Sequence, residues 1–241
     1  WRYESPAMPN GDYNVAVVSV DKADNATSGA QRVTFTVASP LNANGDAGAN
    51  LFKPGAGENA FDGMGGLDVA QYAGARAGFT VRKEVFGYSV TDKAGERDTL
   101  VNIERVQFGD KWLALDVNGV AGQVYRIYQA AFDRVPDAGG FAYWLNAMDK
   151  GYTLNQVANF FMGNKEFIDM YMSDPSGANF INQLYAHVLH RAPDAAGQKW
   201  WIDNIHAASR AEVLAMFTES PENQAQVIGV IQNGIEYTPW G

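Results

Sequence analysis

Hydrophobic and polar residues alternate in short runs in the N-terminal half of the chain, as in 12–20 and 31–37. Strict alternation places successive side chains on opposite faces of a strand, so these runs predict β-structure. In the C-terminal half, apolar residues recur every three or four positions, which is typical of helices with one buried face. We therefore expect a multidomain chain, β then α, divided into 1–40, 41–118 and 119–241.

The two runs at 12–20 and 31–37 predict a hairpin that makes up most of the first segment. A two-stranded hairpin is marginally stable alone, so this one would need further strands that the sequence does not contain. The hairpin resembles the last two strands of a bacterial immunoglobulin-like repeat, which implies that residues 1–40 are a partial immunoglobulin-like segment. Because the chain begins at Trp1 rather than Met, we expect it to be processed or part of a longer modular protein.

Glycine residues are concentrated between 45 and 78, and many of them belong to a nine-residue repeat over 45–71. Each turn of the repeat has glycine in its fourth place, Asn or Asp in its sixth and an apolar residue in its eighth. Glycine permits the left-handed backbone of a tight turn, while Asp side chains and turn carbonyls supply hard oxygen ligands. The turns are Gly45–Lys53, Pro54–Asp62 and Gly63–Gln71, with Asn50, Asn59 and Asp68 in the sixth place.

This repeat resembles the RTX, or hemolysin-type, calcium-binding repeat of type I-secreted bacterial proteins. The resemblance implies a short β-roll in which alternate turns share one face, so that Asp46 and Asn50 stack near Asp68. A calcium-free, glycine-rich connector of similar shape is the alternative, because two of the three sixth places hold Asn instead of Asp. The candidate calcium ligands are Asp46, Asn50, Asn59, Asp62 and Asp68.

Short alternating runs continue through 72–117 and predict strands joined by turns. The passage 98–108 resembles the segment that often follows RTX repeats, which implies that its apolar residues cap the roll. The same resemblance implies that the last residues, 235–241, belong to an uncleaved export signal.

The helical half contains an internal repeat, because residues 128–137 align with 185–194 at an offset of 57 and later residues align at an offset of 56. Each copy predicts a helix, an Arg-x-Pro-Asp turn, a second helix, a short loop and two more helices. Helix-start signals recur in both copies. They are the capping boxes Thr153–Gln156 and Ser209–Glu212, and the turns Arg134–Asp137 and Arg191–Asp194.

Residues 134–144 and their copy 191–201 resemble the bacterial family called domain of unknown function 4214. The resemblance extends over about residues 120–235. It implies a helical domain of a large secreted or surface protein. Because the family carries no assigned activity, the resemblance transfers no catalytic residue.

Four side chains of the helical half are candidates for ligand binding: Arg134, Arg191, Trp200 and Trp201. Each arginine either holds helix-terminal carbonyls or a carboxylate across its turn, or belongs to a site for an anion or sugar acid. Neighbouring residues on a helix point about 100° apart, so one of the two tryptophans is expected to be partly exposed. An exposed indole can stack on a sugar ring or on a partner.

The composition narrows the possible functions. With 27 Asp and Glu against 18 Lys and Arg, the net charge of −9 disfavours binding to nucleic acid or an anionic membrane. The absence of cysteine excludes disulfides, thiolate catalysis and cysteine zinc sites. The sequence contains no serine-hydrolase elbow, zinc-protease motif or phosphate loop, and no apolar run long enough for a membrane span.

These observations predict a non-enzymatic region of a large secreted or surface-attached bacterial protein, acting in adhesion or extracellular assembly. Calcium is the expected cofactor, and the expected partner is a second copy, a surface polymer or a glycan. The expected location is extracellular or at the cell surface, reached by type I secretion. A carbohydrate-binding module, or the accessory tail of a secreted hydrolase, is the alternative.

Overall fold

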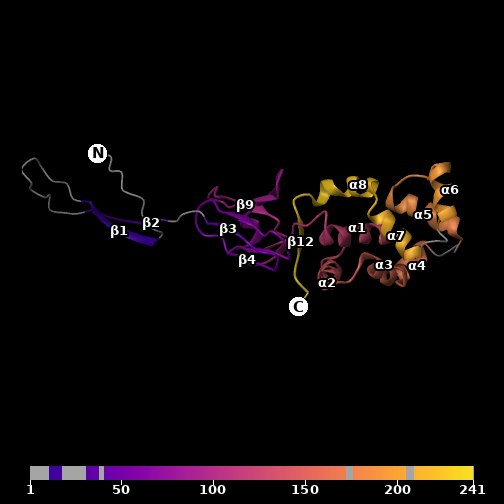
Figure 1. Cartoon of the computed structure of the whole chain (residues 1–241), viewed down its shortest axis with the longest axis horizontal. Coiled ribbons are helices and arrows are strands. Elements are labelled where there is room, and N and C mark those ends of the chain that lie inside the picture. Colours follow the sequence, from indigo (N-terminus) through magenta and orange to yellow (C-terminus); the bar gives the residue numbers. More distant parts are fainter. Residues whose placement is uncertain (1–10, 18–30, 38–40, 172–175, 205–208, 241) are drawn as a thin grey trace, which may run out of the picture.

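The computed structural model describes residues 11–17, 31–37, 41–171, 176–204 and 209–240. Strands occupy the N-terminal part of the chain, and a region of eight described α-helices follows them (Figure 1). The change from β to α occurs between Ala114 and Val120, as the hydrophobic pattern predicts.

Strands β1 (Gly11–Val17) and β2 (Gln31–Val37) form an antiparallel ladder, with Gly11 opposite Val37. Both predicted strands are therefore confirmed. The predicted connection between them falls within 18–30, which lies outside the described residues. The immunoglobulin-like character of this hairpin stays a prediction.

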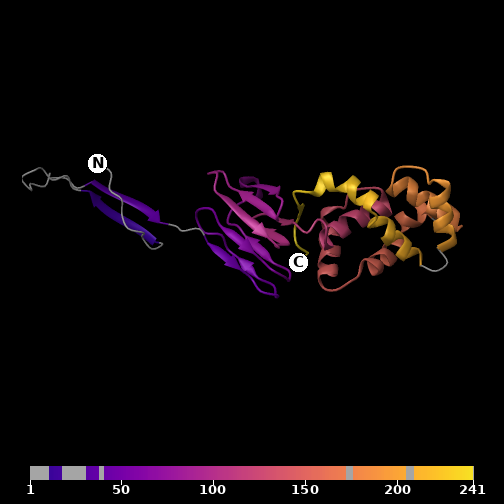
Figure 2. The same cartoon turned by 45° about the horizontal axis from the view of Figure 1, so that its top comes forward.

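Two five-stranded sheets follow, and the chain passes back and forth between them (Figure 2). Within each sheet, three strands are parallel to their neighbours, and the first four of these six strands begin at intervals of nine residues. We call this arrangement the two-sheet coil. Its first sheet contains β3 (Asn42–Asn44), β5 (Ala60–Asp62) and β9 (Arg97–Val101), and its second contains β4 (Leu51–Phe52), β6 (Val69–Gln71) and β10 (Arg105–Gln107).

Apolar side chains fill the space between the two sheets. The rings of Phe52 and Phe61 lie 5.1 Å apart, and Leu100 and Val106 are buried beside them in the same core. Antiparallel strands extend each sheet at one side, and a 3-10 turn, η1 (Arg76–Gly78), leads into the first of them. The added strands are β7 (Thr80–Lys83) and β8 (Tyr88–Thr91) in the first sheet, and β11 (Trp112–Ala114) and β12 (Ile235–Tyr237) in the second.

The helices begin at positions that recur along the chain. The starts of α1 to α4 and of α5 to α8 differ by 57, 57, 56 and 56 residues, the offsets found in the sequence. The helices are α1 (Val120–Phe132), α2 (Ala138–Asp149), α3 (Leu154–Met162), α4 (Lys165–Tyr171), α5 (Gly177–Val188), α6 (Ala195–Asn204), α7 (Arg210–Thr218) and α8 (Pro221–Ile231).

Side chains cap the helices where the sequence predicts it. Thr153 with Gln156 and Ser209 with Glu212 form both hydrogen bonds of a capping box at α3 and α7. Ser220 caps α8, which has a proline in its first turn. These predictions are confirmed, because capping depends only on residues within one turn of the helix.

A buried arginine links the two-sheet coil to the helices. Arg105, at the start of β10, is 2% exposed and pairs with Asp116, and its Nη2 also lies 2.9 Å from both oxygens of Asp149 at the end of α2. The helical core also includes Ala114 and Tyr237 from the second sheet. The two parts therefore share a packed and charged junction.

Candidate functional site

The first candidate site lies where the chain crosses from the first sheet to the second. The loops 45–50 and 63–68 make this crossing side by side, because β3 pairs with β5 and β4 pairs with β6. Residues 102–104 make the same crossing in the next turn of the two-sheet coil. We call 45–50, 62–68 and 102–104 the acidic edge. It contains four of the five candidate calcium ligands, which are Asp46, Asn50, Asp62 and Asp68.

A ladder of hydrogen bonds from backbone to side chain joins successive loops of the acidic edge. The backbone N–H of Asn50 donates to Oδ1 of Asp68 at 2.7 Å, and the N–H of Asp68 donates to Oε2 of Glu104 at 2.8 Å. Each of these three residues directly precedes a strand of the second sheet. A single side-chain oxygen at this position therefore joins two successive turns of the two-sheet coil.

The other carboxylate oxygen of Asp68 has no such partner. Asp68 is 0% exposed, and its Oδ2 makes no hydrogen bond within the described residues. Burial raises the pKa of Asp68, and the nearby carboxylates of Asp46 and Asp62 raise it further, against the N–H of Asn50, which lowers it. A buried acceptor oxygen surrounded by negative charge is stabilised by a proton, as the raised pKa reflects, or by a cation.

Glycine makes room for oxygen atoms at this point. A Cβ at Gly63 would lie 2.1 Å from the carbonyl oxygen of Asn102 and 2.5 Å from Oδ2 of Asp68, so only glycine fits. One oxygen of Asp46 accepts the N–H of Gly48 at 2.7 Å. Similarly, one oxygen of Asp62 accepts the side-chain amide of Asn102 at 2.8 Å.

The donors at the acidic edge suit calcium in their chemistry. They are carboxylate, amide and carbonyl oxygens, which are the hard ligands that calcium takes in sets of six to eight. Within the described part of the chain, no three Asp, Glu or His side chains converge into a metal site. A calcium ion here would therefore draw on the Asn50 amide and the Asn102 carbonyl as well as on Asp46, Asp62 and Asp68.

The fifth candidate ligand, Asn59, lies on the other edge of the coil, where the chain crosses from the second sheet to the first. Its Nδ2 donates to the carbonyl oxygens of Gly55 and Gly57, at 3.2 and 2.9 Å, and to Oδ1 of Asp98 at 2.7 Å. The amide group thus occupies carbonyl oxygens that a metal ion would need. Asn59 is therefore separate from the acidic edge; its Nδ2 donates these hydrogen bonds, while its Oδ1 accepts the backbone N–H of Leu41 at 2.9 Å.

The two candidate arginines make the same contacts in different places. Arg134, after α1, lies 2.9 Å from Glu166 in the first turn of α4. Arg191, after α5, makes two hydrogen bonds of 2.7 and 2.8 Å to Glu222 in the first turn of α8, and this pairing lowers the pKa of Glu222. Each guanidinium also lies over an aromatic ring of the preceding helix. Both arginines therefore tie a turn to a later helix.

Residues 158–227 match the family model described as a domain of unknown function, DUF4214. The match runs from the second half of α3 to α8 and includes Arg191 with its partner Glu222. It is shorter than the stretch of about 120–235 that the sequence resemblance suggests. No curated protein matches the chain.

The DUF4214 match also contains both candidate tryptophans, on α6. Trp200 is 56% exposed, whereas the ring of Trp201 lies 4.7 Å from that of Phe217 and packs against the helical core. The two rings are nearly perpendicular, at 86°. Of the two, Trp200 is the one that can meet a ligand.

Sequence reasoning missed Asn102 and Glu104 at the acidic edge. Both lie beyond the nine-residue repeat, after an antiparallel excursion through β7 and β8. The available signal was the position of Glu104 directly before the alternating run that starts at Arg105, because Asp68 precedes its strand in the same way.

Within the described residues, no helix is long and apolar enough to cross a membrane.

Proposed function

We propose that this chain is a non-enzymatic, calcium-stabilised module that acts in adhesion or extracellular assembly at a bacterial surface. The observation that carries the proposal is the buried oxygen Oδ2 of Asp68, which lies near further carboxylates and has no hydrogen-bond partner among the described residues. Calcium at this point would neutralise the acidic edge and join three successive turns of the two-sheet coil. A two-sheet coil stiffened in this way would hold the helical region at a defined distance from the bacterial surface.

The wider organisation belongs to the same proposal. We interpret the two-sheet coil as a short RTX-like roll, and the helices as two copies of one four-helix unit, of which the second contains most of the DUF4214 match. The hairpin of β1 and β2 is then the end of an immunoglobulin-like domain. An RTX-like roll supports type I secretion and an extracellular or cell-surface location.

Calorimetry of the metal-stripped full chain tests the calcium site. We expect a saturable heat of calcium binding, either released or taken up. We expect Asp68→Asn to abolish this binding. Asp98→Asn is the matched control, because Oδ1 of Asp98 accepts the backbone N–H of Asn59 at the opposite edge, as Oδ1 of Asp68 accepts that of Asn50. Loss of calcium binding in Asp98→Asn but not in Asp68→Asn would place the ion elsewhere and contradict the proposal.

The role in adhesion or assembly has its own test. Sedimentation of the full chain, with calcium and with a chelator, measures self-association, and binding of the labelled chain to bacterial cells measures adhesion. We expect at least one of the two to require calcium and to be lost in Asp68→Asn. A monomer that binds no cells in either condition would contradict this role, even if calcium itself binds.

Carbohydrate binding is a second candidate function, favoured by the exposed indole of Trp200. Its equivalent in the first unit, Tyr143, is 44% exposed and lies in ring contact with Trp240. Glycan-array binding that is lost in Trp200→Ala and retained in Tyr143→Ala would support this function. Trp201→Ala is a poor test, because Trp201 packs against the core and its removal would perturb the fold.

A further inference from the structure

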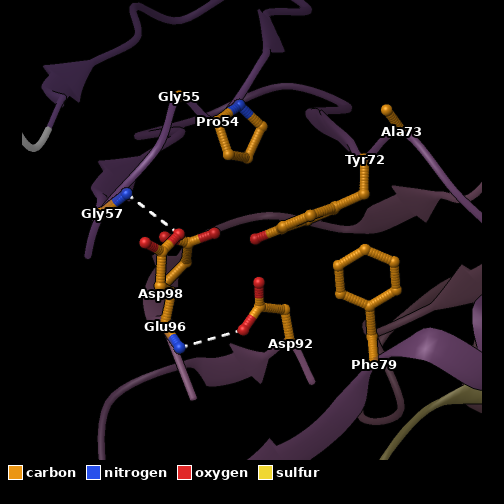
Figure 3. A pocket seen from close by; sticks show the side chains of 9 residues that line it. All are labelled: Pro54, Gly55, Gly57, Tyr72, Ala73, Phe79, Asp92, Glu96 and Asp98. Atoms are coloured by element: carbon orange, nitrogen blue, oxygen red, sulfur yellow. Dashed lines mark hydrogen bonds between the residues drawn. The ribbon is translucent and has the colours of Figure 1, made fainter. Parts of the chain in front are cut away.

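A pocket lies at the edge of the coil opposite the acidic edge (Figure 3). It has a volume of about 200 Å³. Three carboxylates line one side, and a proline and two aromatic rings line the other. We call it the Tyr72 pocket; its lining includes Pro54, Tyr72, Phe79, Asp92, Glu96 and Asp98.

Tyr72 is buried in the wall of this pocket. The residue is 7% exposed, and its hydroxyl has no partner within the described residues. Figure 3 shows the hydroxyl pointing toward the carboxylates of Asp98 and Glu96. Burial raises the pKa of Tyr72 far above its ordinary range, and both the charge of Asp98 and the approach of the hydroxyl to that carboxylate add to this effect, so the hydroxyl stays protonated. It can donate to a carboxylate or accept from a ligand.

Each carboxylate of the pocket has one oxygen engaged and one to spare. Oδ1 of Asp98 accepts the backbone N–H of Asn59 at 2.8 Å, Oδ1 of Asp92 accepts the N–H of Glu96 at 2.9 Å, and Oε2 of Glu96 accepts the N–H of Gly57 at 3.0 Å. No hydrogen bond to the second oxygens occurs in the described part of the chain. None of the three carboxylates forms an ion pair with a described residue.

We infer that the Tyr72 pocket binds a primary ammonium group carried on a short hydrocarbon chain. Single oxygens from Asp92, Glu96 and Asp98, together with the Tyr72 hydroxyl, provide separate acceptors for the three N–H bonds of an ammonium. The rings of Tyr72 and Phe79, 5.2 Å apart, provide an apolar wall for the hydrocarbon chain.

Two other cations fit this pocket less well. A guanidinium prefers both oxygens of one carboxylate, and here each carboxylate offers only one. Calcium needs six to eight oxygens, yet the carbonyls of Gly55 and Gly57 already accept from Asn59. The apolar wall would also leave a calcium ion without ligands on that side. The pocket therefore differs in kind from the acidic edge.

Titration of the calcium-free full chain with n-butylamine tests the inference, because the amine is charged at pH 7, as a lysine side chain is. n-Butanol is the neutral control of the same size. We expect saturable binding of the amine by calorimetry, with shifts of the Gly57 and Glu96 amide resonances, and none with butanol. Equal binding of both probes, or no saturable binding of either, would overturn the inference.

Variants locate the site. Asp98→Asn keeps an oxygen for the Asn59 N–H but removes the charge, and we expect it to weaken amine binding about tenfold. Asp92→Asn serves the same purpose if Asp98→Asn fails to fold. Asp68→Asn, at the acidic edge, should bind the amine as the parent does. Amine binding lost in Asp68→Asn but unchanged in both pocket variants would overturn the inference.

Two further probes distinguish a lysine of a partner protein from a free amine as the source of the ammonium group. Nα-acetyl-lysine methylamide represents a lysine side chain of a partner protein, and putrescine represents a free polyamine. Tighter binding of the first assigns the pocket to a protein partner, and tighter binding of the second assigns it to a free amine; both support the inference. Binding of calcium that is lost in Asp98→Asn, with no binding of either amine, would make the pocket a metal site instead.

Discussion

The two edges of the coil differ, at the level of single residues, by one chemical group. Asp68 at the acidic edge presents an oxygen without a hydrogen-bond partner in the described part of the chain. Asn59 at the opposite edge presents an amide that donates to two loop carbonyls and a carboxylate. The Asn59 amide supplies the positive end of a dipole where calcium would supply a full charge. The choice between Asp and Asn at equivalent places therefore separates a candidate metal site from an edge stabilised by hydrogen bonds.

We predict that Asp68→Asn stabilises the calcium-free chain by about 1 kcal/mol at pH 7, the low end of the cost of a buried polar group without a partner. The pKa of Asp68 is raised in the folded state, so the folded chain binds this proton more tightly than the unfolded chain does. Stability of the parent therefore falls as pH rises above about 3.8. Urea unfolding in a chelator should show a gain that is largest at pH 7 and shrinks toward pH 4; a gain independent of pH would contradict this account.

The unpartnered hydroxyl of Tyr72 leads to a prediction with a built-in comparison. Tyr72→Phe removes a buried hydroxyl that makes no hydrogen bond to any residue that the structure describes, so we expect unchanged or slightly higher stability without ligand. Tyr88→Phe removes a hydroxyl that donates to the Leu115 carbonyl at 2.7 Å and should cost about 1 kcal/mol. Denaturant unfolding of the two variants measures the contrast. An equal loss in both would mean that Tyr72 has a partner after all.

Helices and strands, at the scale of elements, begin where short-range signals place them. The capping boxes of α3 and α7 and the nine-residue spacing of the first coil strands each depend on a few neighbouring residues. The DUF4214 match covers one full set of such signals in the helical half, from α5 to α8. The first set, of which the match reaches only the end of α3 and α4, has the same order of helices and the same pairing of an arginine with a glutamate.

We predict that Thr153→Ala lowers the free energy of unfolding by about 1 kcal/mol, because it removes the side chain that accepts the N–H of Gln156. Ser209→Ala should cost a similar amount at α7. Asn155→Ala, at an exposed position inside α3, is the control and should cost nothing, since alanine favours helix. Circular dichroism during urea unfolding provides the measurement. A cost at Asn155 equal to that at Thr153 would exclude capping as the cause.

At the scale of the whole molecule, the two-sheet coil and the helical region are held together at the junction between sheet and helix. The strand β12, from the end of the chain, pairs with β11 and contributes to the helical core, so sequence-distant segments close the structure (Figure 1). Arg105 pairs there with Asp116 and Asp149 while almost fully buried. A junction built in this way couples the stability of the coil to that of the helices.

We predict that Arg105→Ala lowers the free energy of unfolding by about 3–5 kcal/mol, because it leaves two carboxylates without their partner. Lys165→Ala, which breaks an exposed pair with Asp169, should cost less than about 0.5 kcal/mol. Hydrogen exchange measured in both parts of the chain should show that Arg105→Ala weakens protection in β10 and in α2. Weakened protection in the coil alone would contradict coupling through the junction.

The sequence by itself determined the order of strands and helices and the capping residues, because these depend on local periods and on residues within a turn. The nearness of Asn50 to Asp68 was implied by the resemblance of the nine-residue repeat to RTX repeats. Only the tertiary structure decided which side chains meet across longer separations. The coil alternates between two sheets, so Asp62 joins Asp68 while Asn59 lies on the other edge with Tyr72 and Asp98. The antiparallel excursion of β7 and β8 brings Asp92, Glu96 and Glu104 back onto the coil, and no local pattern carries that information.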